Sequence, residues 1–324
     1  MVRIAIAGSG ISGAYLYRLL CNQGFDDVTV FEQEQPHKTN CGISPCAWGT
    51  SSGFGQLLGH TGLNPAKYAL MQFNHIVMDE MRIEAYAQTF NKPLLISDLL
   101  QGTSVERSPI NIAEYDRVID ATGVSRAYLP RIRDDIVLPC IQYRVHSAWP
   151  LELSIKISKV GYAWIFPLSG NEYHIGAGSL VIEPHKMLNN LGWIKPGDKR
   201  EVLCGCTGKV RLTAPRGSIP YVFQNIWGVG EAIGCVAPLA GEGIIPGMRS
   251  AHILVENWNN PFAYEQAIQE EFAWMENERR VMDRLRRGAN IGMGDGRVLQ
   301  KTTKRLNMKL HLWEALKLLW RARK

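Results

Sequence analysis

The chain has 324 residues, of which 46% are hydrophobic and 20% charged, and it carries a formal net charge of +6. This length predicts about two domains, and the apolar content excludes an intrinsically disordered chain. A nucleic-acid binder is not expected, because clustered basic residues would raise the pI above the 8.9 of this sequence. The seven cysteines are scattered and form no CxxC pair, which is typical of a reducing, cytoplasmic compartment. The eight histidines form no ligand cluster, so no metal is expected, and no apolar run reaches the length of about 18 residues that spans a membrane.

The N-terminus has the pattern of a dinucleotide-binding βαβ unit. A short apolar strand at residues 2–7 is followed by a glycine-rich turn and a helical stretch that ends near Gly24. In such a unit Gly8 permits the tight turn, Gly10 lets the backbone approach a pyrophosphate, and Gly13 lets the helix pack on the strand. The helix N-terminus, which includes Ser12, supplies free N–H groups for the phosphates.

The second strand of this unit, residues 28–31, ends at Glu32. A carboxylate at this position can accept hydrogen bonds from the hydroxyls of an adenosine ribose. The same negative charge would repel a 2′-phosphate. FAD or NAD is therefore expected in preference to NADP.

Two later segments favour FAD over NAD. Residues 115–123 are predicted to form a buried strand that ends in Thr122 and Gly123, and residues 226–232 a third strand that ends in Gly230-Glu231. A loop then leads to a helix predicted over residues 248–258. The loop contains Pro238, Gly241, Gly243 and Ile244. Small residues before a new helix N-terminus make a second anion-binding end, and two such ends suit the two polar regions of FAD.

Residues 138–180 predict an antiparallel sheet inserted between the parallel strands. Apolar and polar residues alternate over 141–146 and 153–158, and the strands 162–168 and 173–177 flank a hairpin turn. Tyr162, Trp164 and Phe166 project from one face of their strand. Such an aromatic stripe more often belongs to a core than to a cofactor wall.

Together these segments resemble the FAD-binding motifs of the p-hydroxybenzoate hydroxylase-like flavoproteins, and among them the geranylgeranyl reductase family. Residues 115–123 match the family's YDxVIDATG, residues 238–244 its PxxGEGI, residues 162–167 its YxWxFP, and Cys41-Gly42 its Cys-Gly pair. The matches span residues 2 to about 258. Three features depart from the family: Glu231 replaces the usual aspartate, Lys159 replaces a proline, and the family's Arg-x-x-Phe-Asp helix has no clear counterpart.

The motif order predicts an α/β fold with two interleaved domains. A Rossmann-like FAD-binding domain is expected over residues 1–137 and 215–260, with an antiparallel-sheet substrate domain over 138–214. A C-terminal helical segment is expected over 261–324.

The resemblance implies an FAD-dependent reductase that saturates C=C bonds of prenyl chains, or of another apolar small molecule, by hydride transfer from reduced flavin. It implies that the strand bearing Tyr162 and Trp164 lines the cavity over the flavin. Cys41 is either a small buried loop residue or a catalytic group near the flavin. The expected FAD contacts are Gly8, Gly10, Ser12, Gly13, Glu32, Gly42, Thr122, Gly123, Gly230, Glu231, Pro238, Gly241, Gly243 and Ile244.

The source of electrons and the reaction class are left open by the sequence. The chain shows no second βαβ nucleotide unit, so a transient donor is expected: NAD(P)H, a reduced deazaflavin or a ferredoxin-like protein. The alternatives on the same fold are a flavin-dependent monooxygenase, another oxidoreductase, or a flavin electron carrier without catalytic activity of its own.

The C-terminal segment carries the basic balance of the chain. From residue 263 acidic residues, among them Glu278, precede basic ones, which predicts a solvated helix. Residues 297–324 hold nine basic residues against one acidic residue. Within residues 306–324 an apolar stripe is formed by Leu306, Leu310, Trp313, Leu316 and Trp320. This composition suits an interfacial helix on an anionic inner membrane face, and equally a helix docked on the protein's own core or on a second subunit.

Overall fold

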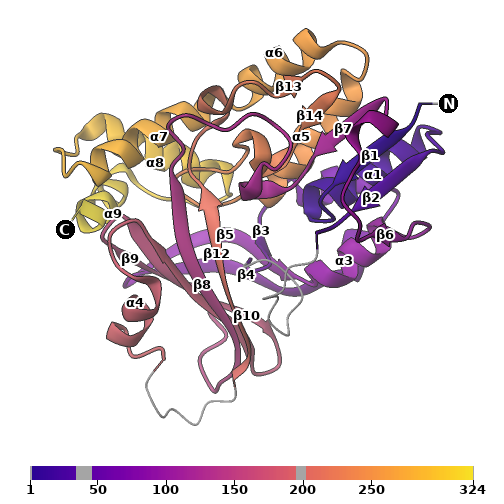
Figure 1. The fold of residues 1–324 in the computed structure, drawn as a ribbon. Coiled ribbons are helices and arrows are strands. Elements are labelled where there is room, and N and C mark those ends of the chain that lie inside the picture. Colours follow the sequence, from indigo (N-terminus) through magenta and orange to yellow (C-terminus); the bar gives the residue numbers. More distant parts are fainter. Residues whose placement is uncertain (1, 34–45, 195–201, 324) are drawn as a thin grey trace.

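The computed structural model describes residues 2–33, 46–194 and 202–323, and Figure 1 labels its elements. One sheet has the strand order β13 (Val222–Phe223), β14 (Ile226–Gly228), β7 (Arg117–Asp120), β1 (Ile4–Ala7), β2 (Val28–Phe31) and β6 (Val105–Glu106). The other has the order β12 (Val202–Arg211), β8 (Val137–His146), β11 (Glu172–Ser179), β10 (Gly161–Ser169), β9 (Ser154–Ser158), β4 (Ala69–Met78), β5 (Met81–Phe90) and β3 (Gly49–Thr50). The α-helices are α1 (Ile11–Asn22), α2 (Phe54–Gly59), α3 (Lys92–Leu99), α4 (Pro184–Asn190), α5 (Ile244–Glu256), α6 (Pro261–Glu271), α7 (Ala273–Arg286), α8 (Met293–Arg305) and α9 (Leu312–Arg323).

The first sheet is parallel apart from its edge strand β13, and its carboxyl edge is where the glycine motifs meet. β1 is buried along its whole length, as expected of a central parallel strand. Ala7, the last residue of β1, lies opposite Phe31 of β2 on one side and Asp120 of β7 on the other. The chain passes from β1 to β2 on one side, and the later strand β7 lies on the other side of β1. The carboxyl edge between β1 and β7 is therefore a topological switch point, where α/β proteins bind ligands.

The second sheet confirms the predicted antiparallel strands β8 to β11. It also contains the hairpin β4–β5, and β4 pairs in parallel with β9. This hairpin lies within the range 1–137 that the sequence assigned to the FAD-binding half. The sequence analysis missed that this hairpin belongs to the second sheet. Sequence patterns indicate pairing between strands that are close in the chain, whereas β4 and β9 are far apart in it.

Two predicted helices have different limits in the structure. The helix expected at 248–258 begins at Ile244, and Pro246 lies in its first turn, where a missing N–H costs no hydrogen bond. The helix expected from residue 263 is two helices that meet at Phe272. The second, α7, is not solvated all round: it buries Glu278 on its apolar face, which corrects the prediction for that residue.

Among the C-terminal helices, α9 packs on β9 of the eight-stranded sheet, on the left of Figure 1, whereas α6 packs on α5. In residues 306–323 the stripe predicted from the sequence is divided: Leu310, before α9, and Leu316 are buried, whereas Trp313 is 66% exposed and Trp320 38% exposed. The backbone N–H of Val160 donates to the carbonyl of Ala322 at 2.8 Å. The leucines of this segment therefore dock on the protein's own core. Within the described residues no helix is both long and apolar enough to cross a membrane.

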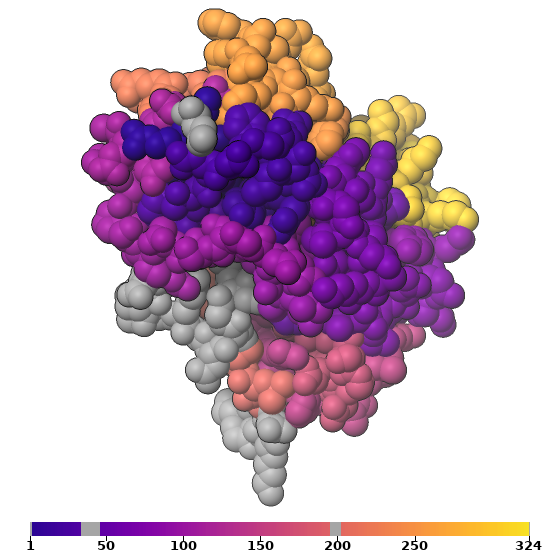
Figure 2. All heavy atoms as spheres, turned by 90° about the vertical axis from the view of Figure 1, so that its right-hand side faces the viewer, coloured from indigo at the N-terminus to yellow at the C-terminus, as the bar shows by residue number. Residues whose placement is uncertain are grey.

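Figure 2 shows the molecule turned by 90°, with the N-terminal βαβ segment in indigo facing the viewer. The C-terminal helices, in yellow, reach the surface at one edge of this view. The βαβ unit and the helices α8 and α9 lie on opposite sides of Figure 1, and residues of both line the cavity described below.

We expect Leu316→Ala to lower the free energy of unfolding by about 2–5 kcal/mol, because the leucine is 2% exposed and packs against Gly296 of α8. Trp313→Ala, on the exposed face of the same helix, serves as the matched control and should change it by less than about 1 kcal/mol. Urea unfolding of both variants measures the difference. Equal losses would contradict the docking of α9 through its leucines.

Candidate functional site

A continuous cavity of about 2020 Å³ runs from the glycine-rich turn to the C-terminal helices. Pockets for small ligands usually hold about 300–1,000 Å³, so this cavity has room for a large cofactor and a second molecule. It is lined by the carboxyl edge of the parallel sheet, by one face of the antiparallel sheet and by α7, α8 and α9. The site therefore lies where the two sheets and the C-terminal helices meet.

At the glycine-rich turn the three glycines have different surroundings. A Cβ atom on Gly13 would lie 2.0 Å from the carbonyl oxygen of Gly8, and Gly8 itself has a φ of +108°. A Cβ atom on Gly10 would meet no described atom within 4 Å, and Gly10 lines the cavity. No described side chain caps α1, so its first N–H groups are open to a ligand. The turn thus forms a cradle for an anion.

Ser12 of α1 packs closely against two glycines, one of which lies in α5. A Cβ atom on Gly230, which follows β14, or on Gly247 of α5 would lie 2.4 Å from the hydroxyl oxygen of Ser12. The backbone of α1 can approach α5 this closely only because both positions are glycine. Gly13 and Gly230 accordingly pack behind the cavity wall, while Gly8, Gly10 and Ser12 line it.

Glu32 lies at the end of β2, beside the glycine-rich turn. Its Oε2 accepts hydrogen bonds from the backbone N–H and the hydroxyl of Ser9, at 3.0 and 2.7 Å. The carboxylate therefore orders the turn, and Glu32 also lines the cavity. This is the position from which a ribose hydroxyl could be bound.

The turn after β7 is held by a buried aspartate that the sequence analysis did not single out. Asp120 accepts hydrogen bonds from the hydroxyl of Thr122 and from the backbone N–H groups of Tyr128 and Leu129. The side chain of Thr122 is thus engaged within the protein, and Thr122 and Gly123 both line the cavity. Gly123 has a φ of +64°, which only a glycine adopts without strain.

Glu231 occupies the middle of the cavity wall. Its Oε1 accepts a hydrogen bond from the backbone N–H of Arg211 at 2.6 Å, and the Arg211 guanidinium pairs with Asp135 at 3.0 Å. Burial raises the pKa of Glu231, and Arg211 opposes this shift. The positive charge of Lys92 opposes it as well. A buried carboxylate of this kind is well suited to accept hydrogen bonds from polyol hydroxyls.

The three aromatic side chains of β10 each lie against a glycine. The hydroxyl of Tyr162 donates to the carbonyl of Ala240 at 2.7 Å, and its ring closes on Gly241. Cβ atoms on Gly176 and Gly49 would lie 2.3 Å from the rings of Trp164 and Phe166. Rings seated so tightly form a rigid wall, and all three border the cavity. Both interpretations of the stripe hold in part, because the rings pack as a core and also line the site.

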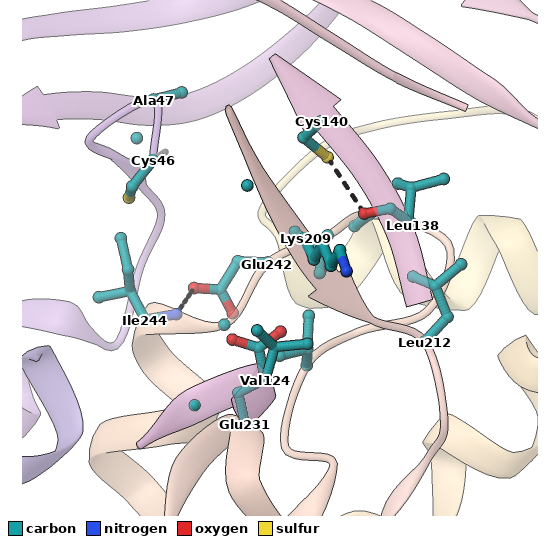
Figure 3. Close-up of a pocket in the computed structure, with 18 of the residues that line it drawn as sticks. Cys46, Ala47, Val124, Leu138, Cys140, Lys209, Leu212, Glu231, Glu242 and Ile244 are labelled. Atoms are coloured by element: carbon teal, nitrogen blue, oxygen red, sulfur yellow. Dashed lines mark hydrogen bonds between the residues drawn. The ribbon is translucent and has the colours of Figure 1, made fainter. Parts of the chain in front are cut away.

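Glu242 caps the second helix N-terminus. Its Oε1 accepts hydrogen bonds from the backbone N–H groups of Ile244 and Ile245, both at 2.9 Å, and Figure 3 shows the carboxylate directed at Ile244. Burial raises its pKa to about 7 against the effect of these two bonds. The sequence predicted that the N–H groups at Ile244 would be open to an anion. In the structure a carboxylate of the chain itself occupies them.

Several residues that border the cavity were not predicted. Lys92, on the first turn of α3, is 8% exposed, and no described residue pairs with its ammonium group. Cys46, Cys140 and Cys206 also line the cavity, and burial raises the pKa of Cys140 to about 12. The helix start at Asn91 was visible in the sequence, but the burial of a lysine at its first turn was not. Cys41 and Gly42, predicted to lie near the flavin, fall outside the described residues.

The far end of the cavity is an apolar chamber. The sheet contributes Ile76, Met78, Leu153, Ile155 and Ile157, and the C-terminal helices and their connection contribute Met282, Leu285, Leu299, Leu306, Met308, Leu318, Leu319 and Ala322. Among the described residues at this end the polar side chains are those of Thr302 and Thr303. Such a chamber suits a flexible hydrocarbon.

No model of a known protein family matches the chain. It is 24% identical to an uncharacterized protein of Methanocaldococcus jannaschii, over 87% of this chain and 91% of that protein. A shorter match, 33% identical, joins 30% of this chain to 26% of the menaquinone reductase of Mycobacterium tuberculosis.

Solved structures resemble the whole chain. A geranylgeranyl bacteriochlorophyll reductase-like protein of Thermoplasma acidophilum matches with a TM-score of 0.70 and 17% identity, over 99% of this chain and 95% of that one. A probable FAD-dependent monooxygenase of Pseudomonas aeruginosa (TM-score 0.64, 14% identity) covers 92% of this chain and 99% of its own. A tryptophan 6-halogenase of Streptomyces toxytricini (TM-score 0.66, 13% identity) matches over 99% of this chain and 90% of its own. The fold is that of the FAD-binding Rossmann-type flavoproteins with a substrate-binding domain, which confirms the predicted fold class.

We expect Gly13→Ala to prevent stable folding, because its methyl group would collide with a backbone oxygen that cannot move aside. Gly10→Ala, three residues earlier, should fold with a free energy of unfolding within about 1 kcal/mol of the parent, since its methyl group would enter the open cradle. Circular dichroism and thermal unfolding of the two variants make the comparison. A Gly10→Ala protein as unstable as Gly13→Ala would show that the cradle is filled.

Proposed function

We propose that the protein is an FAD-dependent reductase that saturates C=C bonds of a prenyl chain. The observation that carries the proposal is the continuity of one cavity, which has a dinucleotide cradle at one end and an apolar chamber at the other. Two of the similar proteins are named a geranylgeranyl bacteriochlorophyll reductase-like protein and a menaquinone reductase, which is consistent with a lipid substrate.

The residues along the polar part of the cavity fit FAD. The open N–H groups of α1 would bind the pyrophosphate, with Glu32 at the adenosine ribose and Glu231 at the ribityl hydroxyls. Lys92 would supply a buried positive charge to the anionic cofactor. When bound, FAD supplies the two electrons of the reduction. Gly42 and Cys41, although outside the described residues, remain proposed neighbours of the flavin.

The chain's own contribution would be orientation and the exclusion of water. An isolated alkene develops no oxyanion that hydrogen-bond donors could stabilise, so its position relative to the cofactor must carry much of the rate enhancement. Tyr162 and Trp164 are fixed against glycines and would hold the reacting bond in place. The chamber beyond them would keep the rest of the hydrocarbon dry.

The outer face of α9 suits a membrane surface, where a prenyl lipid would be found. Trp313 and Trp320 are exposed, and their rings contact each other edge to face with centroids 5.4 Å apart. Lys317 and Arg323 are exposed on the same helix. Aromatic side chains beside basic ones bind the interface of an anionic membrane. We propose that the protein is cytoplasmic and contacts the inner membrane face peripherally through this helix.

We further propose that the electrons come from a transient donor, which is NAD(P)H, a reduced deazaflavin or a ferredoxin-like protein.

A monooxygenase is the second candidate, because the same fold occurs in a probable FAD-dependent monooxygenase. A flavin electron carrier is the third. The apolar character of the chamber favours the reductase over both, since a carrier needs no chamber and an aromatic substrate would use little of its length.

The decisive experiment uses the protein reconstituted with FAD, reduced chemically without oxygen and mixed with a geranylgeranyl lipid in detergent. We expect the lipid to gain about two mass units for each saturated bond in mass spectrometry. Reduced FAD without protein is the control. Unchanged lipid together with rapid electron transfer to an acceptor would favour the carrier, and incorporation of an oxygen atom in air would favour the monooxygenase.

We expect Lys92→Met to raise the dissociation constant for FAD at least about tenfold, because one charge-assisted contact to the cofactor is lost. Lys67→Met is the control: Lys67 is exposed and pairs with Asp98 outside the cavity, so its loss should leave the affinity unchanged. Fluorescence titration of the apoprotein with FAD measures both. Equal affinities for the two variants would remove Lys92 from the site.

A further inference from the structure

Glu278 is a buried carboxylate that the proposed function does not use. It lies on α7, is 0% exposed, and is surrounded by the apolar residues of that helix and by α8. Its neighbour Arg279 turns away to pair with Asp283. An ionisable group in such a position is costly unless hydrogen bonds compensate for the lost water. Its contacts therefore indicate what it does.

The two oxygens of Glu278 bridge two walls of the cavity. Oε2 accepts a hydrogen bond from the backbone N–H of Leu239 at 3.2 Å, and Oε1 accepts one from the hydroxyl of Thr302. Leu239 belongs to the loop 236–243, which we call the cofactor loop because it leads into α5 along the cavity. Thr302 belongs to α8 and lines the apolar chamber. One side chain thus joins the cofactor end to the substrate end.

The cofactor loop is held from two sides. Tyr162 on β10 donates to the carbonyl of Ala240, and Glu278 accepts from the adjacent residue, Leu239. The first contact is made by the substrate sheet and the second by the C-terminal helices. Loss of the second would leave the loop without its hydrogen bond to the C-terminal helices, although the side chain of Leu239 would still pack on the apolar residues of α7.

The charge of Glu278 can change near neutral pH. Burial raises its pKa to about 7, while the hydrogen bonds from Thr302 and Leu239 and the positive charge of Arg305 on α8 oppose the shift. Both protonation states can be accommodated, because the hydroxyl of Thr302 also lies 3.1 Å from the carbonyl of Val298. With Glu278 protonated, Thr302 can donate to Val298 and accept from the carboxyl group. Leu239 would then lose a charge-assisted hydrogen bond.

We propose that Glu278 is a positioning residue, which fixes the cofactor loop against the wall of the substrate chamber and holds it more firmly when ionised. The proposal rests on the proposed function only in taking the cavity as the site of flavin and substrate. The bridge itself requires neither ligand. Its geometry can therefore be tested separately from the reaction.

The first test is hydrogen exchange of the peptide that contains Leu239, followed by mass spectrometry at pH 8. In the Glu278→Gln variant the amide hydrogens of this peptide should exchange at least about tenfold faster than in the parent, because the N–H of Leu239 loses a charge-assisted hydrogen bond. Thr303→Val is the matched control: Thr303 is also buried beside the chamber, but its hydroxyl donates to Gln300. Equal exchange in the two variants overturns the proposal, whether or not the protein binds FAD.

The second test follows the absorption spectrum of bound FAD with pH. Glu242 titrates in the same range on the cofactor loop, so the measurement is made in a Glu242→Gln background. We expect a spectral transition with a midpoint near pH 7 that disappears on adding Glu278→Gln. Adding Thr302→Val instead should move the midpoint upward, because the ionised form loses a hydrogen bond. A transition that persists unchanged in both variants contradicts the positioning role. Failure of the parent protein to bind FAD would refute the proposed function, and the hydrogen-exchange test of the bridge would still stand.

Discussion

The cavity depends on backbone segments that approach one another more closely than any side chain would allow. Gly13 seats α1 against the turn at Gly8, and Gly230 and Gly247 together admit the hydroxyl of Ser12. The same constraint recurs at β10, where three aromatic rings each rest on a glycine of another segment. Each glycine loses more conformational entropy on folding than any other residue would. The side chains packed around these glycines must therefore supply the free energy that stabilises the site.

The sequence predicted local features of the fold well, and long-range ones poorly. The βαβ unit could be recognised because Gly8, Gly10 and Glu32 fall within one short segment and each has a defined physical task. The glycines under Trp164 and Phe166 could not be paired with those rings, since Gly176 and Gly49 come from other strands. The hairpin β4–β5 was missed for the same reason.

Charge placement was the other limit of prediction from sequence. Glu278 stands in a run of charged residues that is typical of a solvated helix, and only the packing of α7 against α8 and the cofactor loop buries it. Lys92 follows a helix cap, where a lysine is ordinarily exposed. Both carry a charge into a low-dielectric interior, so their positions depend on tertiary contacts that no local pattern records.

The wall formed by α9 is one helix thick. Leu318, Leu319 and Ala322 face the chamber, and the tryptophans of the same helix face outward. Loss of this last helix, for example through a premature stop codon, would leave the dinucleotide cradle intact and open the chamber to bulk water. Under the proposed function, reduced FAD in such a truncated protein would be exposed to dissolved oxygen, and its electrons would form hydrogen peroxide. For the reaction that we propose, the terminal helix would separate a reductase from a wasteful oxidase.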